Sequence, residues 1–204
     1  MKISAILAAL LYAGAVGAQG SDAMRDAMRT YFEKEKTAAL IGMGGAIAAG
    51  GTGGYLVTQG DLAKGIGYSL IGIGAIGLVV GGSVYLRTDS QLAKLEKQLE
   101  TTPREYKTFE GARMERVITQ FTILKIAELS IFAGGVATTV VGTTQKAELT
   151  TGIGIGLMLD AALLLLFDYF ADARAQVYMQ QIRDFTLAGR NTEMIQGLSF
   201  NQSF

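Results

Sequence analysis

The chain has 204 residues, and its 18 basic and 18 acidic side chains leave no net charge at neutral pH. A nucleic-acid binder needs a basic surface, which this balance does not supply. Histidine and cysteine are both absent, which excludes thiol and imidazole catalysis, disulfides and the usual zinc or haem ligands. The remaining Ser, Thr and Lys residues form no catalytic motif, so we expect no enzyme, cofactor or metal site.

Residues 1–18 have the pattern of a secretory signal peptide. Lys2 is the basic start, 3–16 is an apolar core, and Val-Gly-Ala at 16–18 is a small-residue cleavage site. Cleavage would make Gln19 the first residue. The alternative is an uncleaved membrane anchor, although this apolar run is short for a membrane span.

The distribution of charge after residue 18 predicts an all-α membrane protein of four long helices. Most charges lie outside four stretches that are rich in Gly, Ala, Leu and Ile, and each stretch has roughly the 20 residues that cross a bilayer. Pro103 is the one proline, so little else interrupts long helices. The expected spans are 38–57, 65–86, 117–141 and 149–170.

Turn residues divide the first two helices. The first is expected from Ser21 to Val57, with a polar, amphipathic first half. A tight turn follows at 58–61, and Asp61 is expected to act as the N-cap of the second helix. That helix crosses the membrane and then continues as a polar extension to Glu100.

The third and fourth helices follow the same plan. Thr-Pro-Arg-Glu at 102–105 combines a capping box with proline at the first helical position, so a new helix begins at Pro103. A turn at 142–145 leads to the fourth helix, whose polar extension is expected to reach Leu187. The last stretch, 189–204, has many Gly, Asn, Gln and Ser residues and is predicted to be a flexible tail.

The two halves resemble each other, which predicts a duplicated helical hairpin. Each turn contains Thr-Gln, then an acidic residue followed by Leu, then Gly-Ile-Gly at 65–67 or 152–154. We therefore expect two tandem hairpins, 19–101 and 102–188, related by a pseudo-two-fold axis. Their polar amphipathic extensions would lie on one side of the membrane and their turns on the other. The apolar side chains of these extensions need partners, within the chain or outside it: Leu92, Leu95, Leu99, Tyr106 and Phe109.

Glycine is unusually frequent in the spans. In water a helix loses about 1 kcal/mol for each glycine relative to alanine, whereas in lipid glycine lets helix backbones approach closely. One interpretation is a surface for oligomerisation, and the other is packing within the chain alone. A Gly-x-Gly-x-x-Gly match at 72–77 follows no strand and predicts no nucleotide site. The GxxxG pairs are Gly50 with Gly54, Gly77 with Gly81, and Gly152 with Gly156.

Four ionisable residues interrupt the last two spans: Lys125, Glu128, Asp160 and Asp168. Charges in lipid normally face a partner or a cavity. Folding the helices about the turn at Thr143 is expected to place Glu128 near the depth of Asp160, and Lys125 nearer Asp168. The cluster would be an ion-pair network that sets helix register, or a proton or cation path through Glu128 and Asp160. A third alternative is a later start of the span, which leaves Lys125 and Asp168 at the interface.

Over Gly65–Gly82 and Gly152–Asp168, the Gly-x-Gly repeats and the mid-span acid resemble the proteolipid subunits of rotary ATPases. The chain departs from that family in its long polar extensions. Its turns also lack the basic Arg-Gln type of loop that the family carries. The resemblance is therefore confined to these two spans.

These features predict a structural membrane subunit. It would oligomerise through glycine-rich faces and present its extensions as a helical stalk to other proteins of a bacterial envelope assembly, such as a secretion, motility or appendage machine. The alternative function is a proton or small-ion conduit. A cleaved signal peptide would place the stalk in the periplasm from the inner membrane, which we favour. The positive-inside rule places it in the cytoplasm, as retention of 1–18 would, and an outer-membrane location is a further alternative.

Overall fold

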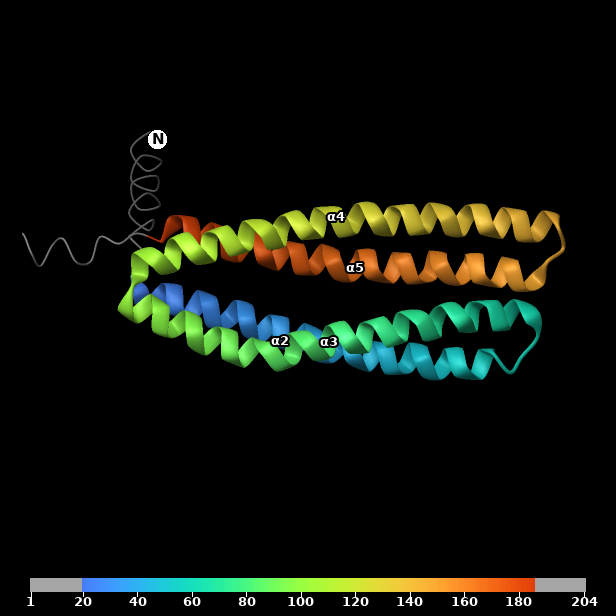
Figure 1. Ribbon diagram of the computed structural model, residues 1–204, viewed down its shortest axis with the longest axis horizontal. Coiled ribbons are helices and arrows are strands. Elements are labelled where there is room, and N and C mark those ends of the chain that lie inside the picture. The colour runs from blue at the N-terminus through green and yellow to red at the C-terminus, as the bar shows by residue number, and fades with distance from the viewer. Residues whose placement is uncertain (1–19, 186–204) are drawn as a thin grey trace, which may run out of the picture.

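The computed structural model describes residues 20–185, which form four helices and no strand. Each helix runs along the same long axis (Figure 1), and the all-helical expectation is confirmed. The predicted signal peptide at 1–18 and the tail at 189–204 lie outside the described residues. The helices are α2 (Ser21–Leu56), α3 (Asp61–Thr101), α4 (Pro103–Thr144) and α5 (Glu148–Asp184).

The helices pack mainly in two antiparallel pairs, α2 with α3 and α4 with α5, and α3 also packs along α5. The turns within the pairs lie at one end of the molecule (Figure 1). The junction between α3 and α4 lies at the other end, together with the start of α2 and the end of α5. The polar halves of all four helices therefore lie at the same end of the molecule, opposite the turns.

The helix ends agree with the sequence pattern, but two predicted caps are wrong. Gly60, in extended conformation, is the N-cap of α3, and Asp61 is its first residue. The Asp61 carboxylate accepts a hydrogen bond from Lys64 at 3.1 Å instead of capping the helix. The Thr102 hydroxyl donates to the Gln98 carbonyl at 3.4 Å, so the capping box does not form. Pro103 does begin α4, because a first helical residue needs no backbone N–H.

The hydrophobic core lies in the polar halves of the helices. We call this end the stalk (21–36, 87–116 and 171–185) and the remainder the arm (37–86 and 117–170). In the stalk, apolar side chains at helical spacing turn inward while most charged side chains face water. The core side chains are Met24, Met28, Tyr31, Phe32, Leu95, Leu99, Tyr106, Met114, Ala175, Tyr178, Met179, Ile182 and Phe185.

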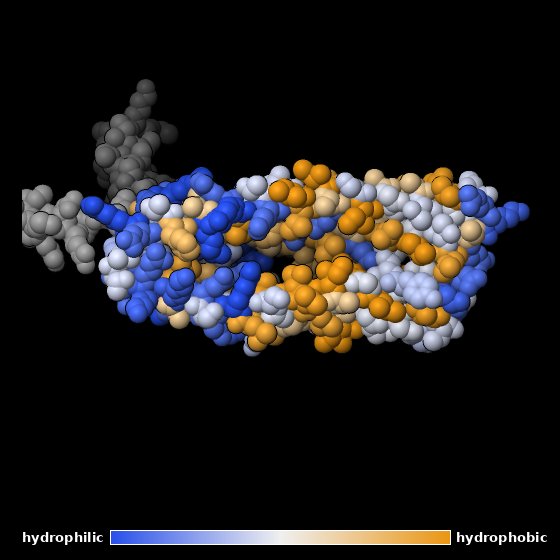
Figure 2. Space-filling view, in the orientation of Figure 1, coloured by the Kyte–Doolittle hydropathy of each residue, from blue (hydrophilic) through white to orange (hydrophobic). Residues whose placement is uncertain are grey.

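In the arm, the pattern of burial is reversed. Large hydrophobic side chains face outward: Ile47 is 65% exposed, Val79 70% and Ile126 61%. Figure 2 shows hydrophobic residues gathered over the arm, with hydrophilic residues over the stalk and at the turns. So large an apolar surface is stable in lipid rather than in water.

Three helices, α3, α4 and α5, are long and apolar enough to cross a membrane, which supports a membrane location. The arm part of α2 does not join them, although we expected a span at 38–57. This part of α2 carries no charged residue, but its many glycines contribute little apolar surface and keep its mean hydropathy low. The fourth span therefore stays a prediction.

Glycine backbones form the helix contacts of the arm. A Cβ added to Gly53 would lie 2.7 Å from the carbonyl oxygen of Gly67 on α3. One added to Gly135 would lie 2.8 Å from the carbonyl oxygen of Gly154 on α5. Between the two pairs, a Cβ on Gly152 would overlap the carbonyl oxygen of Leu62. Each of these three contacts thus requires a residue without a side chain.

The three predicted GxxxG pairs differ in what they face. Gly77 and Gly81 pack against Ala46 and Met43 of α2, and Gly152 and Gly156 pack against Leu62 and Ser69 of α3. Cβ atoms added to Gly50 or Gly54 would meet nothing within 4 Å. Packing within the chain therefore accounts for two pairs. In the third pair, Gly54 faces outward from α2, whereas the backbone of Gly50 also lies against Gly74 of α3.

We expect Gly152→Ala to destabilise the arm by about 1–3 kcal/mol, because the new methyl group overpacks a backbone contact. The matched control is Gly54→Ala, whose methyl group meets open space. The free energy of unfolding of each variant, measured in mixed detergent micelles, checks this. Equal stability of the two variants would contradict the packing of α3 on α5.

Candidate functional site

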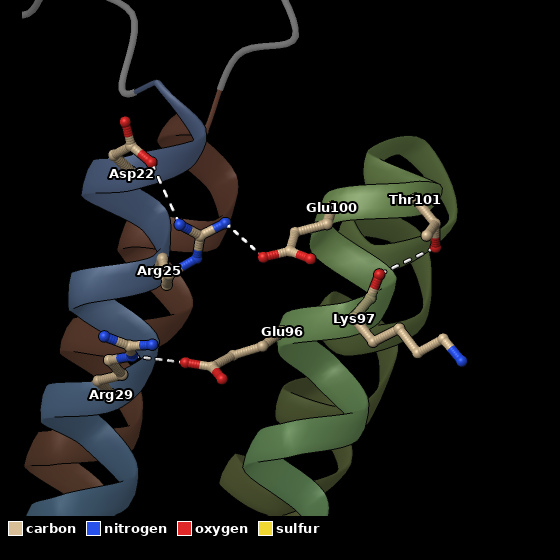
Figure 3. Close-up of polar contacts among 7 residues, drawn as sticks. All are labelled: Asp22, Arg25, Arg29, Glu96, Lys97, Glu100 and Thr101. Carbon is tan, nitrogen blue, oxygen red and sulfur yellow. Dashed lines mark hydrogen bonds and ion pairs between the residues drawn. The ribbon is translucent and has the colours of Figure 1, made fainter.

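Exposed ion pairs join α2 to α3 along the stalk (Figure 3). Arg25 contacts Glu100 at 2.9 Å and also Asp22 of its own helix at 3.4 Å. One turn further along, Arg29 contacts Glu96. Exposed pairs contribute roughly 0–1 kcal/mol each, so they fix the register of α2 on α3 more than they stabilise it.

A buried ion pair lies in the stalk core. Glu110 is fully buried and accepts two hydrogen bonds from the Arg113 guanidinium, at 2.6 and 2.7 Å. The guanidinium carbon lies 5.5 Å from the ring centroid of Phe32. Burial lowers the pKa of Arg113, but the hydrogen bonds and the charge of Glu110 outweigh it, and the net shift is upward. Arg113 therefore keeps its positive charge inside the core.

Three tyrosines pack beside this ion pair. The rings of Tyr31 and Tyr178 stack at a centroid distance of 4.5 Å, and the hydroxyls of Tyr106 and Tyr178 lie 3.0 Å apart. Burial raises the pKa of all three hydroxyls above their ordinary value. The three hydroxyls therefore stay neutral. The hydrogen bond between Tyr106 and Tyr178 gives each of these two buried hydroxyls a partner.

Most of the predicted stalk contact face is used within the chain. Leu95, Leu99 and Tyr106 are buried in the core, and Leu92 packs against it. Phe109 is 47% exposed and lies beside a surface depression. The other residues lining that depression are Lys94, Lys97, Gln98, Thr101, Thr102 and Glu105.

The four ionisable residues of the arm separate into two groups: Lys125, Glu128 and Asp168 lie close together, and Asp160 lies apart from them. Lys125 binds Asp172, a residue that the sequence did not single out, rather than Asp168. Asp168 instead lies within hydrogen-bonding reach of Glu128. Asp160 is 6% exposed and accepts a hydrogen bond from Ser69 of α3.

The register of α4 on α5 explains why Glu128 and Asp160 do not meet. Because α4 continues through Thr144 and α5 begins only at Glu148, the link between the two helices is centred near Lys146 rather than at Thr143. Gly142 packs against Thr151 as a result. Glu128 therefore lies opposite Asp168, about two turns further along α5 than Asp160.

Asp160 lies in the middle of the arm. It is midway between Glu148 and Asp172 on α5, about 18 Å from each at the rise of an α-helix. Its Oδ1 atom is buried and has no hydrogen-bond partner. A carboxylate at such a depth is costly in lipid and needs a partner or a function.

The described residues have surface depressions but no metal-binding cluster. Within residues 20–185, no three acidic side chains approach closely enough to hold a metal ion. A second depression lies on the stalk and is lined by Lys107, Thr108, Gly111, Ala112, Glu115, Met179, Ile182 and Arg183. No family model, curated protein or solved structure matches this chain.

Glu35 gives a test of the stalk by pH. Its burial raises the pKa of the carboxyl above the ordinary value of 4.5, although Arg87 at 3.9 Å opposes the shift. The folded state then binds more protons than the unfolded state between the two pKa values, so stability falls as pH rises through that range. We expect Glu35→Gln to be more stable than the native chain at neutral pH and to lose this dependence.

Thermal unfolding of the chain in detergent at about pH 4 and pH 8 checks this expectation. The control is Glu33→Gln, which removes the same charge from the exposed face of α2 and should keep the pH dependence of the native chain. An equal dependence in the Glu35→Gln variant would show that another group is responsible.

Proposed function

We propose that this chain is a structural subunit of a membrane assembly, anchored by its arm and presenting its stalk in water. The observation that carries the proposal is the reversal of burial between the two ends. The stalk encloses its own hydrophobic core, as a water-soluble helical bundle does. The arm exposes its apolar side chains and packs backbone against backbone, as helices in lipid do.

The dimensions of the arm support a bilayer crossing. From Asp61 to Arg87, α3 rises about 39 Å, and from Glu148 to Asp172, α5 rises about 36 Å. A hydrocarbon core is about 30 Å thick, so polar residues at both ends reach the interfaces. Because α2 packs along α3, we infer that its arm half crosses as a fourth span.

The contact between α3 and α5 supports a duplicated hairpin. Gly65 meets the carbonyl of Leu149, and Gly152 meets the carbonyl of Leu62. Under the alignment of the two Gly-Ile-Gly segments, Gly65 corresponds to Gly152 and Leu62 to Leu149. The contact is thus reciprocal, as at a two-fold axis between identical units. We infer two tandem hairpins around a pseudo-two-fold axis.

The outward face of α2 is the surface that we propose for oligomerisation. This face carries small residues that allow a second helix to approach closely in lipid. Its glycines have no neighbour within 4 Å of an added Cβ: Gly44, Gly45, Gly51 and Gly54. The assembly would belong to a bacterial envelope, with other envelope proteins on the stalk near Phe109. The signal-like segment favours an inner membrane and a periplasmic stalk.

Cysteine cross-linking tests this surface, because the native chain has no cysteine. In native membranes we expect Gly51→Cys to form disulfide-linked dimers under mild oxidation, since it faces outward on α2. The control is Val136→Cys, on the exposed face of α4, which should remain monomeric. The measurement is non-reducing electrophoresis. Monomers from both variants would contradict an interface at α2, and equal dimers would indicate random collision.

A second candidate function is a conduit for protons or small ions, favoured by the unpaired oxygen of Asp160 at mid-arm. The scaffold proposal expects no flux above that of empty vesicles when the chain is reconstituted under a pH gradient. Flux that Asp160→Asn or Glu128→Gln abolishes, with assembly intact, would replace the scaffold with the conduit. Loss of assembly in these variants without native flux would support the scaffold.

A further inference from the structure

Two carboxyl groups face each other where α4 packs on α5, one turn into the arm from the ion pair of Lys125 and Asp172. The two helices run antiparallel. A step of one turn from Lys125 toward the end of α4 reaches Glu128, and the matching step back from Asp172 reaches Asp168. The two carboxyl groups lie within hydrogen-bonding reach of each other.

This pair has two acceptors and no donor. Glu128 is 4% exposed, and its Oε2 atom is buried without a hydrogen-bond partner. The Oδ2 atom of Asp168 is likewise buried without a hydrogen-bond partner. The nearest cation, Lys125, is held by Asp172. Two ionised carboxylates in contact repel each other strongly, and buried polar oxygens need a donor.

We propose that Glu128 and Asp168 form a proton-binding site and share one proton in the folded chain. The proton supplies the donor that the geometry lacks, as in other carboxyl pairs that cannot both ionise. It also lowers the charge of the group. The charged groups that face the pair are Lys125 of α4 and Asp172 of α5. With the proton bound, one positive charge stands against two negative charges instead of three.

We expect protons to reach the site from the stalk side. The Lys125 side chain is 32% exposed, and it lies between the pair and the stalk. On the other side, Asp160 is about 12 Å further along α5 and bonds to Ser69 of a different helix. The site therefore holds a proton near one membrane interface without a step to Asp160. It is a property of the folded arm that goes beyond scaffolding and does not require conduction.

Infrared spectroscopy of the full chain in lipid bilayers tests the proposal. At neutral pH we expect a carbonyl-stretch band from a protonated carboxyl group. Glu128→Gln and Asp168→Asn should each remove the same band. The double variant should remove no more than either single variant, because one proton is shared between two carboxyl groups. Asp160→Asn is the matched control and should leave this band in place.

Circular dichroism confirms that each variant keeps its helices, and the two single variants serve as alternatives if one fails to fold. Persistence of the band in both folded variants would overturn the proposal. Loss of separate bands that add up in the double variant would also overturn it, because each carboxyl group would then carry its own proton. Absence of any such band from the native chain would show that the pair is ionised.

Discussion

The architecture depends on the direct contact between the backbones of α3 and α5 at Gly65 and Gly152. Lipid gives helices no hydrophobic reason to associate, so close packing must supply the attraction. The carbonyl oxygens of Leu62 and Leu149 occupy the space that side chains would take. This contact holds one helix pair to the other in the arm, and thereby brings together the four helix ends that enclose the stalk core.

The same helices meet two solvents, and each half is stabilised in a different way. In the stalk, Phe32 and Tyr178 leave water, and the buried charges of Glu110 and Arg113 neutralise each other. In the arm, large side chains such as Val79 face outward and leave the contacts to glycine. The helices pass from one half to the other without a break.

The helix boundaries and the stalk leucines could be predicted from sequence, because Pro103, the glycine turns and the 3–4 spacing are local signals. The pairing of charges could not. The partner of Glu128 depends on where α4 ends and where α5 begins, and the polar run from Thr143 to Glu148 does not show from sequence that the link is centred near Lys146. Glu110 and Arg113 have the spacing of a solvated surface pair, and nothing local shows that Glu110 is buried. Ser69 was missed because its contact with Asp160 joins α3 to α5, which belong to different helix pairs.

The reciprocal contact at Gly65 and Gly152 has a consequence for the origin of the chain. Residues that meet at a two-fold axis meet equally well when the two halves are separate molecules. A single hairpin with one such Gly-Ile-Gly segment could already pair with its own copy. On the proposed duplication, gene fusion needed only the short link around Thr102 to join two subunits that already fitted. The halves could then diverge, and acids such as Glu128 appear in the second half without a counterpart in the first.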